Sequence, residues 1–152
     1  MIEDLDKPPG RGAFVGEVHA NVLMAMGCTA LVTNGAVRDV GDIAPTGFQM
    51  FASTVSVSHA YAHVLDFAGP VNIGGLTIQP DDLLHADRHG IQTVPLEVSE
   101  TIPAVAREIR LRRRRLIEVA RSADFSLDKL REALAKPDPS SQGPPSSAAP
   151  LA

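Results

Sequence analysis

The sequence predicts an α/β fold followed by a helical C-terminal extension. First, a helical pattern over Gly16–Met26 is followed, after a tight connection, by a short buried strand over Ala30–Thr33. A helix joined directly to a strand in this way is an α/β unit. Second, the middle of the chain alternates apolar runs with Gly- and Asp-rich turn signals, which indicates β-hairpins. Third, two helical patterns follow Pro95.

Composition bounds the class of protein. The chain has 152 residues, enough for one domain with a sizeable core, and its five Phe, one Tyr and no Trp leave that core mainly aliphatic. A formal net charge of −4 argues against nucleic acid as the default partner. The single Cys28 excludes an internal disulfide framework and fits a reducing compartment. With no signal-peptide pattern and no apolar run of ~20 residues, we expect a cytoplasmic protein that does not enter the membrane.

The first part of the chain contains the predicted α/β unit. Met1 and Ile2 look like the end of a strand, and Glu3–Gly10 like the loop that leaves it. We therefore expect that an N-terminal part of the domain is missing. The helix over Gly16–Met26 ends at Gly27, a typical C-cap, and its first turn presents unpaired backbone N–H groups where a carboxylate can bind.

The apolar run Leu31–Thr33 is followed by Asn34-Gly35-Ala36-Val37 and then by an adjacent cation and carboxylate, Arg38 and Asp39. We expect Asn34–Asp39 to form a loop beyond the carboxyl end of the strand, where ligands of α/β proteins usually bind. Arg38 offers a planar fork for a substrate carboxylate, and Asp39 a hard oxygen ligand for a divalent cation.

The remaining elements follow in order. Asp42–Pro45 suggests one helical turn, and Phe48–Ala52 a second short strand. Ser53–His63 is ambiguous, although alternating residues from Val55 to Tyr61 resemble a strand. The clearest hairpin is Pro70–Ile78 around Gly74-Gly75, and a second pairs Leu83–Ala86 with Ile91–Val94.

The C-terminal part reads as two helices and a tail. Thr101–Ala120 has helical periodicity, and Ser126 is a suitable N-cap for a helix that ends at Ala135. From Lys136 onward Pro, Ser, Ala and Gly dominate, which predicts disorder. We therefore divide the chain into an α/β core at 1–95, C-terminal helices at 96–135 and a disordered tail at 136–152.

These motifs together resemble a known family, that of the regulator of ribonuclease activity A and the 4-hydroxy-4-methyl-2-oxoglutarate aldolases. Twenty residues separate Glu17 from Arg38-Asp39, which matches the acidic-x20-Arg-Asp spacing of the family's aldolases. The stretch from Pro70 to Gly90 resembles the family's second block. One departure is Asp81, where the family usually has Gly, so backbone strain is expected there.

The resemblance implies a swivelling α/β/α sandwich-type domain that assembles as a trimeric ring or as a pair of rings, a hexamer. It also implies sites at subunit interfaces that use Mg²⁺ or Mn²⁺. The activity would be cleavage of 4-hydroxy-4-methyl-2-oxoglutarate or a similar compound to pyruvate and a second keto acid. Oxaloacetate decarboxylation would accompany it.

The same resemblance implies roles for individual residues. Asp39 would coordinate the metal directly, and Glu17 would hold it through a water molecule. Arg38 would pair with the substrate and favour the enolate. The helix start would bind a substrate carboxylate through Gly16, Glu17, Val18 and His19.

Simpler interpretations apply to several residues. Locally, Arg38-Asp39 could be an exposed ion pair and Glu17 a favourable first-turn acid. The remaining candidates are read as structural. We expect no metal ligation from His59 and His63, surface positions in a turn for His85 and His89, burial for Cys28, and a solvated or interface-facing helix for the arginines between Arg107 and Arg121.

Two functions of different classes remain open. One is a metal-dependent lyase acting on pyruvyl substrates. The other is a non-catalytic regulator that binds a ribonuclease or helicase, or an inactive fragment of the family domain. Regulators that resemble the founding member lack the acid after the site arginine, so Asp39 favours the lyase.

Overall fold

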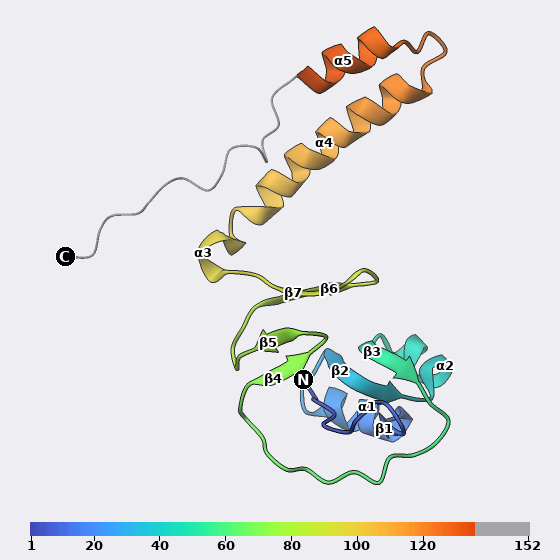
Figure 1. Ribbon diagram of the computed structural model, residues 1–152, viewed down its shortest axis with the longest axis vertical. Coiled ribbons are helices and arrows are strands. Elements are labelled where there is room, and N and C mark those ends of the chain that lie inside the picture. Colours follow the sequence, from blue (N-terminus) through green and yellow to red (C-terminus); the bar gives the residue numbers. More distant parts are fainter. Residues whose placement is uncertain (136–152) are drawn as a thin grey trace, which may run out of the picture. The chain divides into compact units, whose positions relative to one another are not determined.

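The structure is a computed structural model, and it describes residues 1–135. The chain divides into two compact units, Met1–Val94 and a second unit that begins at Pro95. Figure 1 shows the first in blue to green and the second in yellow to red. The first unit contains every residue predicted to form the site.

A three-stranded parallel sheet, in the order β1-β2-β3, forms the centre of the first unit. Its strands are β1 (Ala13–Val15), β2 (Ala30–Val37) and β3 (Gln49–Val55). Helix α1 (Glu17–Ala25) connects β1 to β2, while α2 (Val40–Ile43) and a 3-10 turn, η1 (Ala44–Thr46), connect β2 to β3. The main core cluster consists of Val15, Ala20, Leu31, Val37, Ile43 and Phe48.

Strand β2 is longer than predicted. The segment Asn34–Val37 was expected to be a loop but continues the strand, because Ala36 and Val37 are buried in the sheet. The register shifts between Thr33 and Ala36, and there the side chain of Asn34 exchanges two hydrogen bonds with the backbone of Asp4. The amide of Asn34 therefore holds the N-terminal loop against the sheet.

Met1 and Ile2 were predicted to end a strand, and Ile2 forms a single parallel bridge to Thr33 on β2. The chain then loops out and returns to the sheet as β1. Strand β1 was not predicted, since three residues are too few to show a period.

Both predicted hairpins are present. Strands β4 (Val71–Ile73) and β5 (Leu76–Ile78) pair through Gly74-Gly75, and both glycines have positive φ, as a two-residue hairpin turn requires. Strands β6 (Leu84–Asp87) and β7 (Gly90–Thr93) form the second hairpin. Asp81, where the family usually has Gly, has a φ of 70°, so the expected backbone strain is found there.

The ambiguous stretch 53–63 is only partly a strand. Strand β3 ends at Val55. Beyond it, an isolated parallel β-bridge joins His59 to Ala13 of β1. Figure 1 shows the segment that follows as a long arc between β3 and β4.

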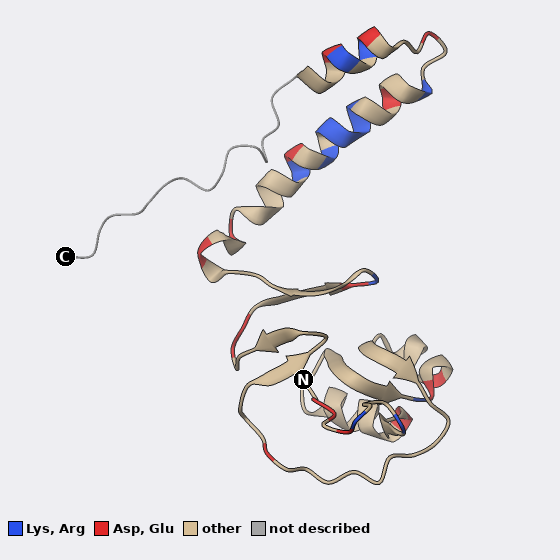
Figure 2. Ribbon diagram, viewed as in Figure 1, with Lys and Arg blue, Asp and Glu red and all other residues tan. Residues whose placement is uncertain are grey.

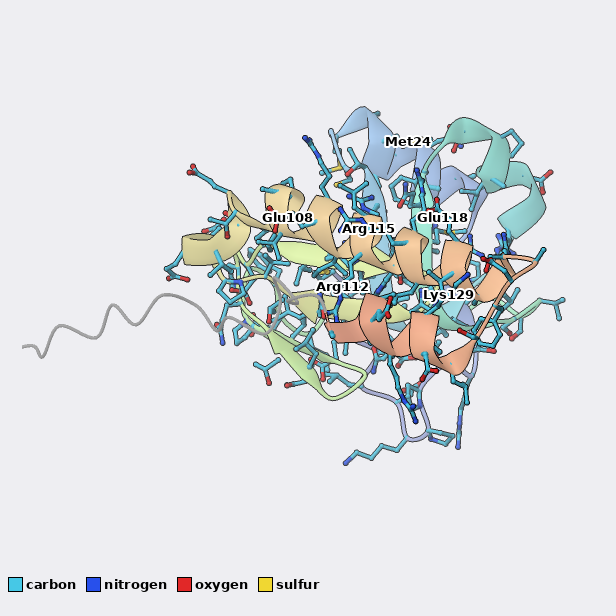
Figure 3. All side chains as sticks on the ribbon, turned by 90° about the horizontal axis from the view of Figure 1, so that it is seen from above. Met24, Glu108, Arg112, Arg115, Glu118 and Lys129 are labelled. Atoms are coloured by element: carbon cyan, nitrogen blue, oxygen red, sulfur yellow. The ribbon has the colours of Figure 1, made fainter. Side chains whose placement is uncertain are left out.

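The second unit is helical. It contains α3 (Leu96–Ser99), which was not predicted, and the two predicted helices, α4 (Ile102–Arg121) and α5 (Leu127–Ala135). Arg112 donates a hydrogen bond of 3.3 Å from its guanidinium group to the carbonyl of Leu134, and Figure 3 shows its place on α4. The predicted disordered tail, 136–152, lies outside the described residues.

Positive charge is concentrated on α4 (Figure 2). No residue of α4 is buried, so its arginine run lies on a largely solvated helix, as predicted. Within residues 1–135, no helix has the length and apolar character needed to span a membrane.

The packing of the core predicts how much stability is lost when a buried side chain is shortened. Ile43 is fully buried against α1 and the sheet, so Ile43→Ala should lower the free energy of unfolding by about 2–5 kcal/mol. Urea denaturation of the variant measures the loss. Val22→Ala, at a position that is 52% exposed, is the control and should change the free energy by about 0.5 kcal/mol or less. Equal losses would contradict the assigned core.

Candidate active site

The candidate site lies where β1 and β2 end side by side. Because the two strands are parallel neighbours, their carboxyl ends share one edge of the sheet. The backbone N–H of Arg38 donates a 3.0 Å hydrogen bond to the carbonyl of Val15. Gly16 and Glu17 follow β1 directly, so this bond brings the start of α1 next to Arg38 and Asp39.

Asp39 is the centre of this arrangement. It has left-handed backbone angles, with φ of 55° and ψ of 34°, which are uncommon for a residue with a side chain although Asp tolerates them. Its Oδ2 accepts a 3.1 Å hydrogen bond from the N–H of Glu17. The same oxygen lies 3.5 Å from Nε of Arg38. Strained residues that are held in place by neighbours are frequent at functional sites.

Gly16 is required for this contact. A Cβ atom at Gly16 would lie 2.6 Å from Oδ2 of Asp39 and 2.8 Å from Nε of Arg38. Both distances are shorter than real contacts of a Cβ atom. The glycine therefore allows the carboxylate and the guanidinium group to approach the backbone.

The helix start differs in one respect from the sequence-based expectation. The N–H of Glu17 was expected to bind a substrate carboxylate but already donates to Asp39. The N–H groups of Val18 and His19 remain in the first turn, where an α-helix supplies no partner for them. The ring of His19 packs at 5.2 Å from the ring of Phe14.

The site is open to solvent. The side chains of Arg38 and Asp39 are 38% and 34% exposed, and Glu17 is exposed. An ion pair with this exposure contributes little to stability. The open guanidinium group is therefore available to an anion, and the carboxylate to a cation.

The donor atoms at Asp39 fit a magnesium or manganese ion that is otherwise bound by water. Oδ2 is occupied by Glu17 and Arg38, whereas Oδ1 makes no hydrogen bond to any residue within the described chain. In residues 1–135 no three His, Cys, Asp or Glu side chains come together as a metal site. Magnesium commonly binds through one or two carboxylates and retains several waters, so a single carboxylate is compatible with such an ion.

The other candidates do not join this site. His59 contacts the carbonyl of Ala60 through Nδ1, and His63 packs edge-on against Tyr61. Cys28 is exposed, which corrects the expectation that it is buried. It lies in the turn between α1 and β2, outside the packed faces of both elements.

His85 and His89 lie on the β6–β7 hairpin, exposed as expected, and both face Asp87. Nδ1 of His89 is 3.1 Å and Nε2 of His85 is 3.9 Å from Oδ2 of Asp87. The backbone N–H and then the ring of His89 hydrogen-bond the carboxylate, which lowers the pKa of Asp87 below 3.8.

Comparison with known proteins assigns the family. The model of the RraA-like family, described as Aldolase/RraA, matches residues 3–92. The chain belongs to the RraA-like family. The match covers most of the first unit and includes both halves of the candidate site, so the predicted resemblance is confirmed.

Individual relatives agree with this assignment. An Azotobacter vinelandii protein named "Putative 4-hydroxy-4-methyl-2-oxoglutarate aldolase" is 36% identical over 87 residues, covering 56% of this chain and 53% of the relative. Protein DlpA of Legionella pneumophila is 27% identical over 119 residues, covering 77% of this chain and 19% of the relative. The chain thus spans about half the length of the first of these relatives and about a fifth of the second.

A solved structure gives the fold. A Pseudomonas syringae pv. tomato protein, described as uncharacterized, has a TM-score of 0.65 at 24% identity, over 83% of this chain and 64% of that one. This similarity confirms the predicted α/β class.

The close approach at Gly16 predicts the effect of one added methyl group. Gly16→Ala should displace the Asp39 carboxylate, because a Cβ atom there would lie 2.6 Å from its Oδ2. The groups that must move are the ends of partly exposed side chains, so the loss of stability should be about 1 kcal/mol or less. Gly41→Ala is the matched control, since a Cβ there meets nothing within 4 Å. An NMR spectrum of both variants tests this: the backbone amide signal of Glu17 should shift in Gly16→Ala and stay in place in Gly41→Ala, and an unchanged Glu17 amide in Gly16→Ala would contradict the described packing.

The hydrogen bonds of Asp87 on the β6–β7 hairpin predict a lowered pKa for this residue. An NMR titration should give Asp87 a pKa below 3.8. His89→Ala should raise this pKa but not as far as 3.8, since the backbone N–H of residue 89 still donates to the carboxylate. The pKa of Asp87 is lower in the folded chain than in the unfolded chain. This hydrogen bonding therefore contributes its full stabilisation above about pH 3.9, and the stabilisation is lost as the pH falls through the pKa of the folded state. An Asp87 pKa at or above 3.8 would contradict the geometry.

Proposed function

We propose that the chain is a divalent-metal-dependent lyase that cleaves 4-hydroxy-4-methyl-2-oxoglutarate or a similar 2-keto acid to pyruvate, and that also decarboxylates oxaloacetate. The observation that supports this most directly is the position of the Asp39 carboxylate. Its Oδ2 accepts a hydrogen bond from the Glu17 amide and lies beside Arg38, while its Oδ1 makes no hydrogen bond to the described residues. Family membership and the aldolase names of relatives support the reaction class.

The two reactions share one chemical requirement. In the aldol cleavage the C4 hydroxyl gives its proton to a base and the C3–C4 bond breaks, while in the decarboxylation the C3–C4 bond of oxaloacetate breaks and C4 leaves as carbon dioxide. In both, the electron pair of the broken bond moves onto the 2-keto oxygen and gives the enolate of pyruvate. The site must therefore stabilise negative charge at that oxygen.

Arg38 is suited to the first part of this task. Its guanidinium group can pair in a bidentate manner with the carboxylate adjacent to the keto group. Its position is set by the bond from its own N–H to Val15, so that pairing would orient the substrate relative to Asp39. The first-turn amides of Val18 and His19 offer a second anchor for a carboxylate.

Asp39 would hold the cation, and Glu17 would contribute through a water molecule. A divalent cation there would act as a Lewis acid toward the keto oxygen. The hydrogen bond from the Glu17 amide keeps Oδ2 of Asp39 in place, so Oδ1 would be presented in one orientation. This preorganisation is what makes a single carboxylate effective.

We further propose that the chain assembles as a homotrimer or hexamer. The exposure of Arg38, Asp39 and Glu17 supports this, since a site that stabilises an enolate needs walls that exclude water. In such an assembly a neighbouring copy would supply them.

The proposal is tested by pyruvate release. The purified chain should release pyruvate from oxaloacetate and from 4-hydroxy-4-methyl-2-oxoglutarate with Mg²⁺ or Mn²⁺, and a chelator should abolish the release. Asp39→Asn keeps the size and one acceptor but removes the charge, so kcat/KM should fall by at least about 100-fold. Full activity of Asp39→Asn would refute the site.

The variant Arg38→Lys tests whether the substrate is bound by the planar guanidinium group of Arg38 or by its positive charge alone. It keeps the positive charge and loses the planar fork, so KM should rise by about tenfold or more. Asp42→Asn, an exposed acid in the adjacent helix α2, is the matched control and should retain wild-type kinetics. Equal losses in the control and in Asp39→Asn would indicate a general charge effect.

A further inference from the structure

Helix α4 carries a concentration of positive charge that the candidate site does not use. The helix contains seven arginines and two glutamates, and Figure 2 shows the arginines in blue along it. Residues 1–94, by contrast, contain ten acidic residues and four basic ones, so the negative net charge of the chain comes from the first unit. Such a difference in charge between two parts of one chain favours an anionic partner for the basic part.

Four of these arginines share one face of the helix, and we call them the arginine stripe: Arg107, Arg110, Arg114 and Arg121. With 3.6 residues per turn, they fall within about 60° of arc and extend over about 21 Å of the helix. No other residue between the first and the last of them falls in this arc, and all four are exposed. The stripe is therefore a continuous line of positive charge without large apolar side chains.

The stripe lies on the side of α4 that faces away from α5. The half-buried residues of α4 centre about 150° around the helix from the stripe. One of them, Arg112, donates its hydrogen bond to the carbonyl of Leu134 on α5. The half-buried set consists of Ala106, Ile109, Arg112, Leu116 and Val119. Packing between the two helices thus leaves the stripe open to a partner.

The charges of the stripe are not neutralised by neighbours. None of the four arginines forms an ion pair with a carboxylate within residues 1–135. Nε of Arg110 donates a 3.2 Å hydrogen bond to the carbonyl of Ala106, and its two terminal amino groups make no hydrogen bond to a described residue. Arg110 and Arg114 are four positions apart, and like charges at this spacing destabilise a helix. An anionic partner would remove this repulsion.

The composition of α4 selects among anionic partners. An interface with an acidic protein is built around an apolar core, which the stripe lacks. A helix on an anionic membrane inserts its apolar face into the lipid, whereas α4 turns Ile109, Leu116 and Val119 toward α5. The phosphates of nucleic acid bind through charge alone, and the planar guanidinium group matches a phosphate.

The same composition selects among nucleic acids. Proteins usually hold single strands by stacking bases on aromatic side chains, and neither α4 nor α5 contains an aromatic residue. The major groove of double-stranded RNA is too narrow for protein side chains to enter, whereas that of B-form DNA, about 12 Å wide, admits an α-helix.

We propose that the arginine stripe of α4 binds the phosphate backbone of double-stranded DNA. Phosphate contacts carry no sequence information, so the binding depends little on base sequence. The net charge of −4 argued against nucleic acid as the default partner, but the acidic excess belongs to residues 1–94. This binding is independent of the proposed lyase activity, which uses residues of the first unit.

The salt dependence of binding tests the proposal. The full chain is titrated into a fluorescein-labelled 20-base-pair DNA duplex of mixed sequence, and fluorescence anisotropy gives Kd between 50 and 200 mM KCl. Each phosphate that is neutralised contributes about −0.9 to the slope of the logarithm of affinity against the logarithm of salt concentration. Four contacts should give a slope of about −3 to −4, so the affinity should fall by about 100-fold across this range.

Two double variants with the same change in charge locate the contact. Arg107→Gln/Arg114→Gln removes half of the stripe, so it should weaken binding by at least about tenfold at 50 mM KCl and make the slope shallower by about 2. Arg113→Gln/Arg115→Gln removes two exposed arginines of the same helix outside the stripe. It should change Kd by about threefold or less and leave the slope unchanged.

A charge-preserving variant separates loss of contact from loss of folding. Arg107→Lys/Arg114→Lys should bind within about threefold of the wild type, because a lysine still neutralises a phosphate. Circular dichroism should show the same helical content in all three double variants, since Gln, Lys and Arg have similar helix propensities.

Five results would overturn the proposal. Absence of binding at 50 mM KCl excludes the partner, and equal losses in the two glutamine variants mean that the total charge acts rather than the stripe. Duplex RNA or single-stranded DNA of the same length that binds as tightly as duplex DNA excludes the selection of B-form DNA. Tighter binding to phosphatidylserine vesicles than to DNA assigns the helix to a membrane surface.

Discussion

The structure of the site depends on how two neighbouring parallel strands end. The bond from the Arg38 N–H to the carbonyl of Val15 fixes the end of β2 against the end of β1. The Glu17 N–H then reaches Asp39, and Gly16 leaves room for both side chains. Backbone geometry thus positions the two charged groups, so their weak mutual ion pair need not do so. For this reason the two exposed charges of the candidate site are held in a defined orientation.

Much of this arrangement followed from the sequence. The helix over 16–26, both hairpins and the two C-terminal helices were predicted because period and turn chemistry are local properties. The Arg38-Asp39 pair was identified by its place after a buried run and by its spacing from Glu17. Backbone strain at Asp81 was expected from the family resemblance, since the family usually has Gly there.

What the sequence did not predict arises from contacts between distant residues. Strand β1 is defined by pairing with β2, and β2 continues to Val37 because Ala36 and Val37 pair with Thr54 and Val55 of β3. Asp39 was expected as a ligand, yet its hydrogen bond to the Glu17 amide depends on a left-handed turn that no local pattern specifies. Exposure of Cys28 likewise follows from where α1 ends.

The hydrogen bond between Glu17 and Asp39 spans 22 positions of the chain. The entropy of closing a loop grows slowly with its length, and this loop is itself organised as a helix and a strand. Both halves of the site therefore belong to one consecutive β1–α1–β2 segment, with neither hairpin nor C-terminal helix threaded between them. In kinetic terms the site needs the closure of one loop between two parallel strands, which is slow compared with the formation of a hairpin but does not await the docking of either hairpin.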